Sequence, residues 1–150
     1  MLTPLFRSAV TWTAVGLAGG LAYREITKLA GFTGFTQLGL VHTHSLALGT
    51  TVFLVVLALG AALRLQKHRL MRWFLIVWNA GLALTVAMLA VKGTLQVRGD
   101  ALADSAAIAG VAGLGHMTLA AGFVLLLLLV RAGLRDREAL ESALPQGSPR

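Results

Sequence analysis

Cysteine is absent from this chain of 150 residues, and charged residues make up only 13% of it. Without cysteine there is no disulfide framework, no thiolate metal site, no iron–sulfur cluster and no cysteine nucleophile. Soluble domains carry about 25% charged residues, whereas here 57% of the residues are hydrophobic and the mean hydropathy is +0.78. This composition argues against a soluble globular domain, and more strongly against a disordered chain, since low hydrophobicity defines that class.

The common nucleotide and hydrolase motifs are also missing. The sequence has no Walker loop, no dinucleotide fingerprint and no Gly-x-Ser-x-Gly elbow. The net charge of +7 would suggest nucleic acid as the partner of a soluble protein. Here the basic residues lie at the ends of apolar runs, so we expect a lipid bilayer as the partner and no nucleic acid.

Four apolar stretches approach or exceed the roughly 20 residues that a membrane helix needs. They cover about residues 8–23, 38–63, 73–91 and 105–130. We therefore predict an all-α fold, an integral membrane four-helix bundle, with residues 1–131 as the four-span domain and 132–150 as a cytoplasmic tail that starts as a short helix. An alternative interpretation takes residues 1–22 as a cleaved signal peptide.

The distribution of lysine and arginine predicts the orientation of the spans. With both termini inside, nine of the 13 basic residues lie on the inner side, which favours an N-in, C-in protein of the bacterial cytoplasmic membrane. The inner set is Arg7, Arg64, Lys67, Arg69, Arg72, Arg131, Arg135, Arg137 and Arg150, and the outer set is Arg24, Lys28, Lys92 and Arg98.

Histidines lie inside two of the predicted spans. Ionisable side chains are costly in hydrocarbon, so they are expected to have a partner and a function. A rise of ~1.5 Å per residue puts His44 about 9 Å and His116 about 16 Å below the outer ends of their helices. The two helices could therefore each supply a histidine to one metal. His42 and His44 are about 200° apart on a helix. Either the span starts between them or they serve different partners, one in the bundle and one across a subunit interface.

Neutral imidazole binds iron, copper and zinc. The leading hypothesis is haem b, with His42, His44 and His116 as candidate iron ligands and the outer cations Arg24, Lys92 and Arg98 as partners for the propionates. The alternatives are a copper or zinc site built from the same histidines, and a structural or accessory protein in which the histidines only pack. Whether the protein is an enzyme stays open.

Several motifs resemble an uncharacterised family of small bacterial four-helix membrane proteins of unknown function. They are Tyr23-Arg24-Glu25 with Thr27-Lys28, Gly31-Phe32-Thr33-Gly34, Val41-His42-Thr43-His44 and Gly113-Leu114-Gly115-His116. The resemblance covers nearly all of residues 8–130 and implies no activity.

The entry of the second span, with His42-Thr43 followed by Leu46, Leu48 and Gly49, is similar to the second helix of the catalytic subunit of haem–copper oxidases and nitric oxide reductases. This resemblance implies that His42 ligates haem b near the outer surface. It also implies a fold like one four-helix arc of that subunit, and hence a homo-oligomer, specifically a homotrimer. The sequence has no adjacent His-His pair for copper and no cross-linkable tyrosine motif, which argues against oxygen reduction. Electron transfer with an unknown redox partner, or gas binding, is the expected role.

Overall fold

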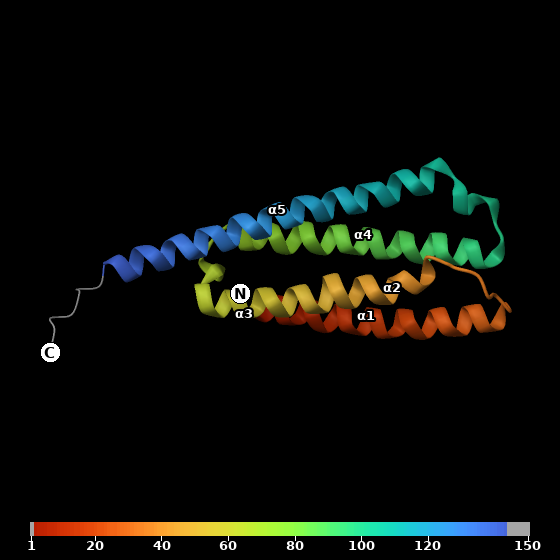
Figure 1. Ribbon diagram of the computed structural model, residues 1–150, viewed down its shortest axis with the longest axis horizontal. Coiled ribbons are helices and arrows are strands. Elements are labelled where there is room, and N and C mark those ends of the chain that lie inside the picture. Colours follow the sequence, from red (N-terminus) through yellow and green to blue (C-terminus); the bar gives the residue numbers. More distant parts are fainter. Residues whose placement is uncertain (1, 144–150) are drawn as a thin grey trace.

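The computed structural model describes residues 2–143, which form a bundle of long helices with no strand in that range (Figure 1). Helix α1 spans Leu2–Leu29, and a second long helix spans Leu38–Leu63. Helices α4 (Leu70–Arg98) and α5 (Ala106–Ser142) form an antiparallel pair. Short 3-10 turns, η2 (Leu65–Lys67) and η3 (Ala101–Asp104), lie in the connections that precede α4 and α5. The predicted all-α fold is confirmed.

The second long helix is not regular. It consists of α2 (Leu38–His44), a π-helical segment η1 (Ser45–Thr51) and α3 (Val52–Leu63). A π turn contains about one residue more than an α turn and is frequently found at functional sites. This segment begins directly after His44, and the sequence pattern gave no indication of it.

The core lies where the four long helices meet, and it includes Leu119 and Leu129 of α5. Phe53, Phe74 and Trp78 are fully buried, and Trp78 donates from its indole N–H to the carbonyl of Leu48 in the π segment. Trp12 of α1 donates in the same way to the side-chain oxygen of Asn79 at 2.9 Å. These two indole N–H groups thus find their acceptors inside the bundle.

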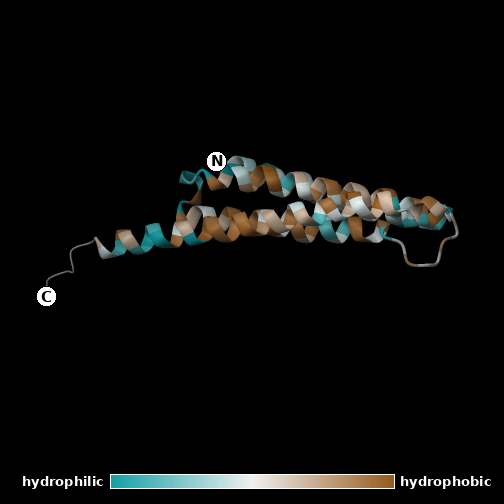
Figure 2. Ribbon diagram, turned by 90° about the horizontal axis from the view of Figure 1, so that it is seen from above, coloured by the Kyte–Doolittle hydropathy of each residue, from teal (hydrophilic) through white to brown (hydrophobic). Residues whose placement is uncertain are grey.

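Three of the long helices are long and apolar enough to cross a membrane, namely Leu38–Leu63, Leu70–Arg98 and Ala106–Ser142. Helix α1 is not among them, because serine, threonine and glycine dilute its apolar residues between Arg7 and Arg24. Hydropathic colouring shows the apolar middle and the polar ends of the bundle (Figure 2). Only 22–39% of the residues in each apolar stretch are buried by the chain itself, so most apolar side chains face outward, toward lipid or another chain.

Helix α5 is longer than predicted. It begins at Ala106, where Ser105 caps it by accepting from the Ile108 N–H, and it continues without a break to Ser142. Its 37 residues correspond to about 55 Å, well beyond the ~30 Å of a hydrocarbon core. The predicted boundary at residue 131 therefore falls inside one continuous helix. The end of the predicted tail, 144–150, lies outside the described residues.

Candidate functional site

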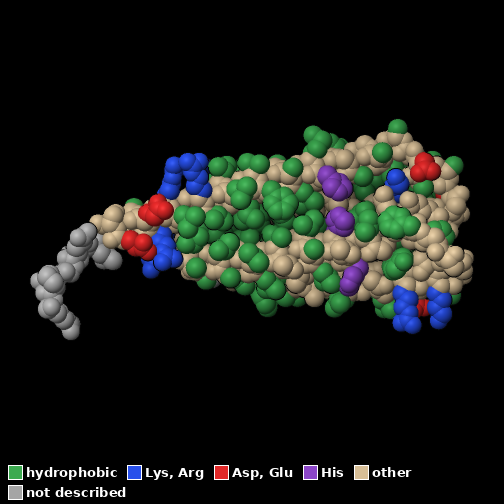
Figure 3. Space-filling view, in the orientation of Figure 1, with side chains coloured by type: hydrophobic (Ala, Val, Ile, Leu, Met, Phe, Trp, Pro, Cys, Tyr) green, Lys and Arg blue, Asp and Glu red, His purple; other side chains and the backbone are tan. Residues whose placement is uncertain are grey.

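Histidines of two helices meet in the half of the bundle where α2 and α5 begin. The imidazole of His44, on α2, lies with its ring centre 6.5 Å from that of His116, on α5, and the two ring planes are 84° apart. Histidine side chains gather at one level along the long axis of the bundle (Figure 3). His44 is half-buried and His116 is exposed at the surface of the bundle. The sequence had predicted that these two helices could bring one histidine each to a common point, and for this pair they do.

Hydrogen bonds orient both rings. The Nδ1 atom of His44 lies 3.0 Å from the carbonyl oxygen of Leu40, and Nδ1 of His116 lies 3.0 Å from the carbonyl oxygen of Ala112. A carbonyl oxygen only accepts hydrogen bonds, so each neutral ring carries its proton on Nδ1 and donates it. The lone pair is then on Nε2, the atom that would bind a metal. Metal-ligating histidines are typically oriented in this way by a carbonyl or carboxylate at the other nitrogen.

The histidine pair lines a pocket of about 210 Å³ between α2, α4 and α5. Leu40, Leu89, Ala109 and Ala112 supply apolar walls, and Gln37, Thr85 and Lys92 supply polar groups. Lys92 is half-buried, six residues before the end of α4. The pocket therefore combines two free imidazole nitrogens, apolar walls and one cation.

Thr85 is a residue of this pocket that sequence reasoning missed. Its side chain is 1% exposed, and its hydroxyl has no hydrogen-bond partner. Gly115 lies directly against it, since a Cβ at Gly115 would be 2.6 Å from Thr85 Oγ1. A single threonine in an apolar helix is common in membrane proteins, so nothing in the sequence distinguished this one.

His42 faces away from the pair. Its Nδ1 lies 2.9 Å from the carbonyl oxygen of Gly16 in α1, and Gly20 leaves room for the ring, because a Cβ there would be 2.9 Å from Nδ1. The two histidines of the His-x-His motif thus have different partners, as the 200° separation predicts. Within residues 2–143, no three His, Asp or Glu side chains are close enough together to hold a metal ion. The predicted set of His42, His44 and His116 is therefore not one cluster.

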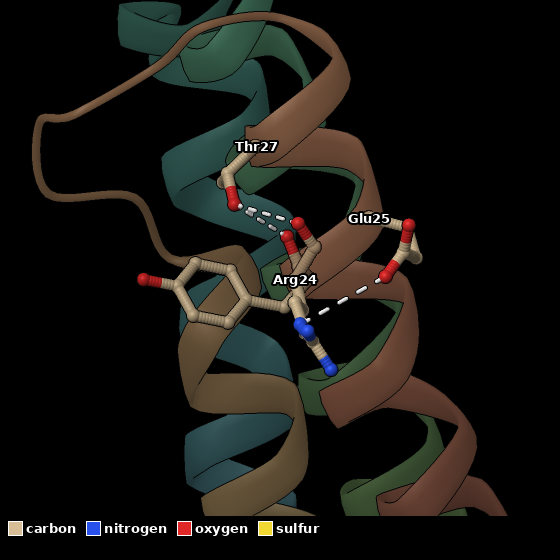
Figure 4. Close-up of polar contacts among 4 residues, drawn as sticks. Arg24, Glu25 and Thr27 are labelled. Carbon is tan, nitrogen blue, oxygen red and sulfur yellow. Dashed lines mark hydrogen bonds and ion pairs between the residues drawn. The ribbon is translucent and has the colours of Figure 1, made fainter.

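The two other predicted cations do not line the pocket. Arg24 lies on α1 with its Nε 3.9 Å from Glu25 Oε1, and its side chain is 74% exposed (Figure 4). Thr27, one turn on, donates to the carbonyls of Tyr23 and Arg24. Arg98 is exposed at the end of α4. Of the predicted cations, the structure brings Lys92 alone to the histidine pair.

The fourth histidine, His68, lies in the short loop between η2 and α4. Its side chain is only 21% exposed, and its Nε2 lies 3.4 Å from Asp136 Oδ2 on α5. The length of α5 explains this contact, because the helix carries Asp136 to the loop. His68 lies at the opposite end of α4 from Lys92, outside the histidine pocket.

The comparisons with known proteins give one match. The model of a family described as "Protein of unknown function (DUF2871)" matches residues 2–133. No curated protein and no solved structure matches the chain. The similarity of the second helix to haem–copper oxidases therefore stays a prediction. The match to the family includes the His44–His116 pair and reaches from α1 to Gly133 of α5. The chain belongs to the DUF2871 family.

Proposed function

We propose that this chain is a haem b-binding integral membrane protein whose iron is held by His44 and His116. The observation that carries the proposal is the pairing of these two rings from different helices, each with Nδ1 bonded to a carbonyl. Two imidazoles bound to one ion from opposite sides through bonds of about 2 Å have ring centres roughly 6 Å apart. The observed 6.5 Å is close to that separation.

Two features of the surroundings support haem as the group that the pair holds. Lys92 is the cation that would meet a propionate, and Leu40 and Leu89 provide apolar contact. Next to His116, α5 presents small residues with open space. A Cβ added at Gly110 or Gly113 would meet nothing within 4 Å. A flat macrocycle could extend over this surface, beyond the 210 Å³ of the pocket itself.

The haem would supply a reversible one-electron couple. The residues of the chain would set its potential through burial, axial ligation and nearby charge. Bis-histidine ligation favours electron transfer, with a redox partner still to be identified. Release of one histidine would open the iron to a small gas, and exposed His116 is the better candidate for that change.

We propose a four-span, N-in/C-in protein of the bacterial cytoplasmic membrane. Helix α1 lies along the second long helix for most of its length (Figure 1). We therefore expect α1 to cross the hydrocarbon layer beside that helix, although its own hydropathy is lower. The excess of basic residues at the end of the bundle with Arg64 and Arg72 supports this orientation. The exposed apolar faces support a homo-oligomer, with a homotrimer as the form suggested by the resemblance to one arc of haem–copper oxidases.

A bare copper or zinc ion is the second candidate. The pocket volume of about 210 Å³ favours it, because a ligand site for a large organic group usually has at least 300 Å³. Two histidines leave positions free, which water or a second chain would fill.

Visible spectroscopy of protein purified from haem-sufficient cells tests the proposal. We expect a haem b spectrum at near-stoichiometric amount that disappears in His44→Ala and in His116→Ala. His68→Ala is the matched control, because His68 lies outside the pocket, and it is expected to keep the spectrum. Lys92→Gln should weaken haem binding without abolishing it. Carbon monoxide added to the reduced protein separates an open iron from a bis-histidine one.

A colourless wild-type protein would refute haem binding. Metal analysis of the same sample then tests the second candidate, which requires near-stoichiometric copper or zinc that is lost in the same two histidine variants. A protein with neither haem nor metal would leave a packing role for the histidines.

A further inference from the structure

A second polar pocket lies at the other end of α4, far along the helix from Lys92. It has a volume of about 420 Å³ and is formed by the η2 turn and the first residues of α4. Three cations line it, Lys67, Arg69 and Arg72, together with the indole of Trp73. Three positive charges around one hollow predict an anionic occupant, and arginine favours phosphate oxygens because its planar fork donates two parallel hydrogen bonds.

The η2 turn, which carries Lys67 and leads through Arg69 into α4, is held in place by the core. Arg64 begins it with φ 54° and is the one non-glycine residue with positive φ in the described part of the chain. Such a conformation persists only where the surroundings impose it. Leu65, the next residue, is fully buried, and α5 makes room for it at Gly133, where a Cβ would clash with the Leu65 side chain. Lys67 therefore extends from a fixed turn, and Arg72 lies on the first turn of α4, which follows directly.

The wall of the pocket also contains polar atoms without partners. Gln66 Oε1 and His68 Nε2 are buried and make no hydrogen bond, although Asp136 Oδ2 lies 3.4 Å from His68 Nε2. Buried polar atoms normally find a partner in protein or solvent. The amide oxygen of Gln66 accepts hydrogen bonds, so a rotation of this side chain that turns the oxygen into the pocket would let it bind a hydroxyl group. An occupant with both a phosphate and a hydroxyl would match the cations and this acceptor together.

The position of Trp73 places the pocket at the surface of the membrane. Its ring is 55% exposed, whereas Trp12 and Trp78 are 7% and 0% exposed. Exposed tryptophan at the end of an apolar helix is typical of the headgroup layer. Ile76, one turn deeper, also lines the pocket and leads from the cations to the apolar face of α4. A phospholipid has this order of groups, with an anionic headgroup above acyl chains.

We propose that this pocket binds the headgroup of an anionic phospholipid, of which phosphatidylglycerol is the representative. Lys67, Arg69 and Arg72 hold the phosphate, Gln66 accepts from a glycerol hydroxyl, and Trp73 and Ile76 contact the start of the acyl chains. The proposal requires that the helices lie in a bilayer and is independent of any cofactor at the histidine pair.

Tryptophan quenching by brominated lipids tests it in reconstituted full-length protein. Bilayers of phosphatidylcholine would contain a small fraction of either brominated phosphatidylglycerol or brominated phosphatidylcholine, and Trp73 would report the local lipid. We expect an apparent affinity for phosphatidylglycerol about fivefold or more above that for phosphatidylcholine, the factor given by about one cation at the surface. Trp73→Phe should remove most of the difference, since the other two indoles are buried.

Arg69→Gln/Arg72→Gln should reduce the preference to near unity. The matched control is Arg135→Gln/Arg137→Gln, which removes the same charge from the same end of the molecule but not from this pocket. An equal preference in these two variants would overturn the proposal, because it would indicate a diffuse charge effect. Circular dichroism checks that the variants fold, and Arg69→Lys/Arg72→Lys should keep part of the preference if the site is formed.

Free inorganic phosphate is the other possible source of the anion. With phosphate exchanged for chloride at constant ionic strength, a lipid site keeps its preference for phosphatidylglycerol. Loss of the preference in phosphate would overturn the lipid assignment in favour of a soluble phosphate ligand. Absence of any preference in the wild type would overturn the proposal as a whole.

Discussion

At the scale of single residues, glycines determine how closely the helices approach. Gly93 of α4 faces the start of α2 so tightly that an added Cβ would overlap the backbone of Leu38. The same contact is tied by Thr36, which donates to the Gly93 carbonyl at 2.7 Å. Gly110 of α5 is the opposite case, since nothing lies within 4 Å of the position of its Cβ.

Gly93→Ala and Gly110→Ala form a matched pair. Gly93→Ala should destabilise the protein by about 1–3 kcal/mol, because backbone must move to relieve the overlap. Gly110→Ala should be neutral or stabilising by up to ~1 kcal/mol through helix propensity. Denaturation in detergent, followed by helical circular dichroism, measures both. Equal effects of the two substitutions would show that α2 and α4 are not in this close contact.

The unpartnered hydroxyl of Thr85 predicts opposite effects on stability and binding. Thr85→Val should stabilise the empty protein by about 1 kcal/mol, because it removes a buried hydroxyl that has no hydrogen bond. The same substitution should weaken the binding of any ligand that the hydroxyl contacts in the histidine pocket. Melting temperatures with and without cofactor measure the two effects. A destabilised empty Thr85→Val protein would mean that the hydroxyl has a partner after all.

At the scale of elements, the π segment Ser45–Thr51 sets the rotation of α2 relative to α3. Gly49 within it lies against Trp12, and Leu48 accepts the hydrogen bond of Trp78. These contacts, on two sides of the helix, fit the wider turn. The segment connects α3, which packs in the core through Phe53, to α2, which carries His44. It therefore sets the direction in which the His44 side chain points.

Insertion of one alanine after exposed Ala47 tests this link. One extra residue should rotate α2 by about 100° relative to α3, which would carry His44 away from His116. We expect lower thermal stability and, if the proposed haem is bound, loss of its spectrum. Ala47→Leu is the control and should change neither. An insertion variant with native stability and an unchanged spectrum would show that this segment does not set the direction of His44.

At the scale of the whole molecule, charge and apolar surface predict how the bundle sits in a membrane. Lysine and arginine lie at both ends of the visible face, with mostly apolar and uncharged groups between them (Figure 3). The absence of cysteine makes the orientation directly measurable, because any introduced cysteine is unique.

Single-cysteine variants should label according to the N-in, C-in orientation. In intact cells, a membrane-impermeant maleimide should react with Lys28→Cys and Asp100→Cys on the outer side. It should react with Lys67→Cys and Ser142→Cys only after the cells are opened. The reverse pattern would invert the proposed topology. Labelling of Ser142→Cys in intact cells, with the other three variants as predicted, would mean that α5 does not end inside.

Composition and hydropathy were sufficient to predict four helices near the observed positions, because apolar runs of this length have a helix as their favoured form in lipid. The ends were less predictable. Helix α5 continues to Ser142 through charged residues, since helix propensity there does not depend on hydropathy. The same extension of α5 brings the carboxylate of Asp136 to 3.4 Å from His68 Nε2.

For the candidate site, helical geometry predicted that His42 and His44 point in different directions if both lie on one helix, and that His44 and His116 lie at compatible depths. Only the tertiary structure decided which of them meet. His42 packs against α1, where its ring contacts Gly16 and Gly20. His44 instead lines the pocket that α2 forms with α4 and α5. Thr85 lines the same pocket, and α5 can approach it closely because Gly115 has no side chain. This contact joins two helices, so no local sequence pattern predicts it. Periodicity and depth are properties of one helix, whereas the choice of partner depends on how several helices pack.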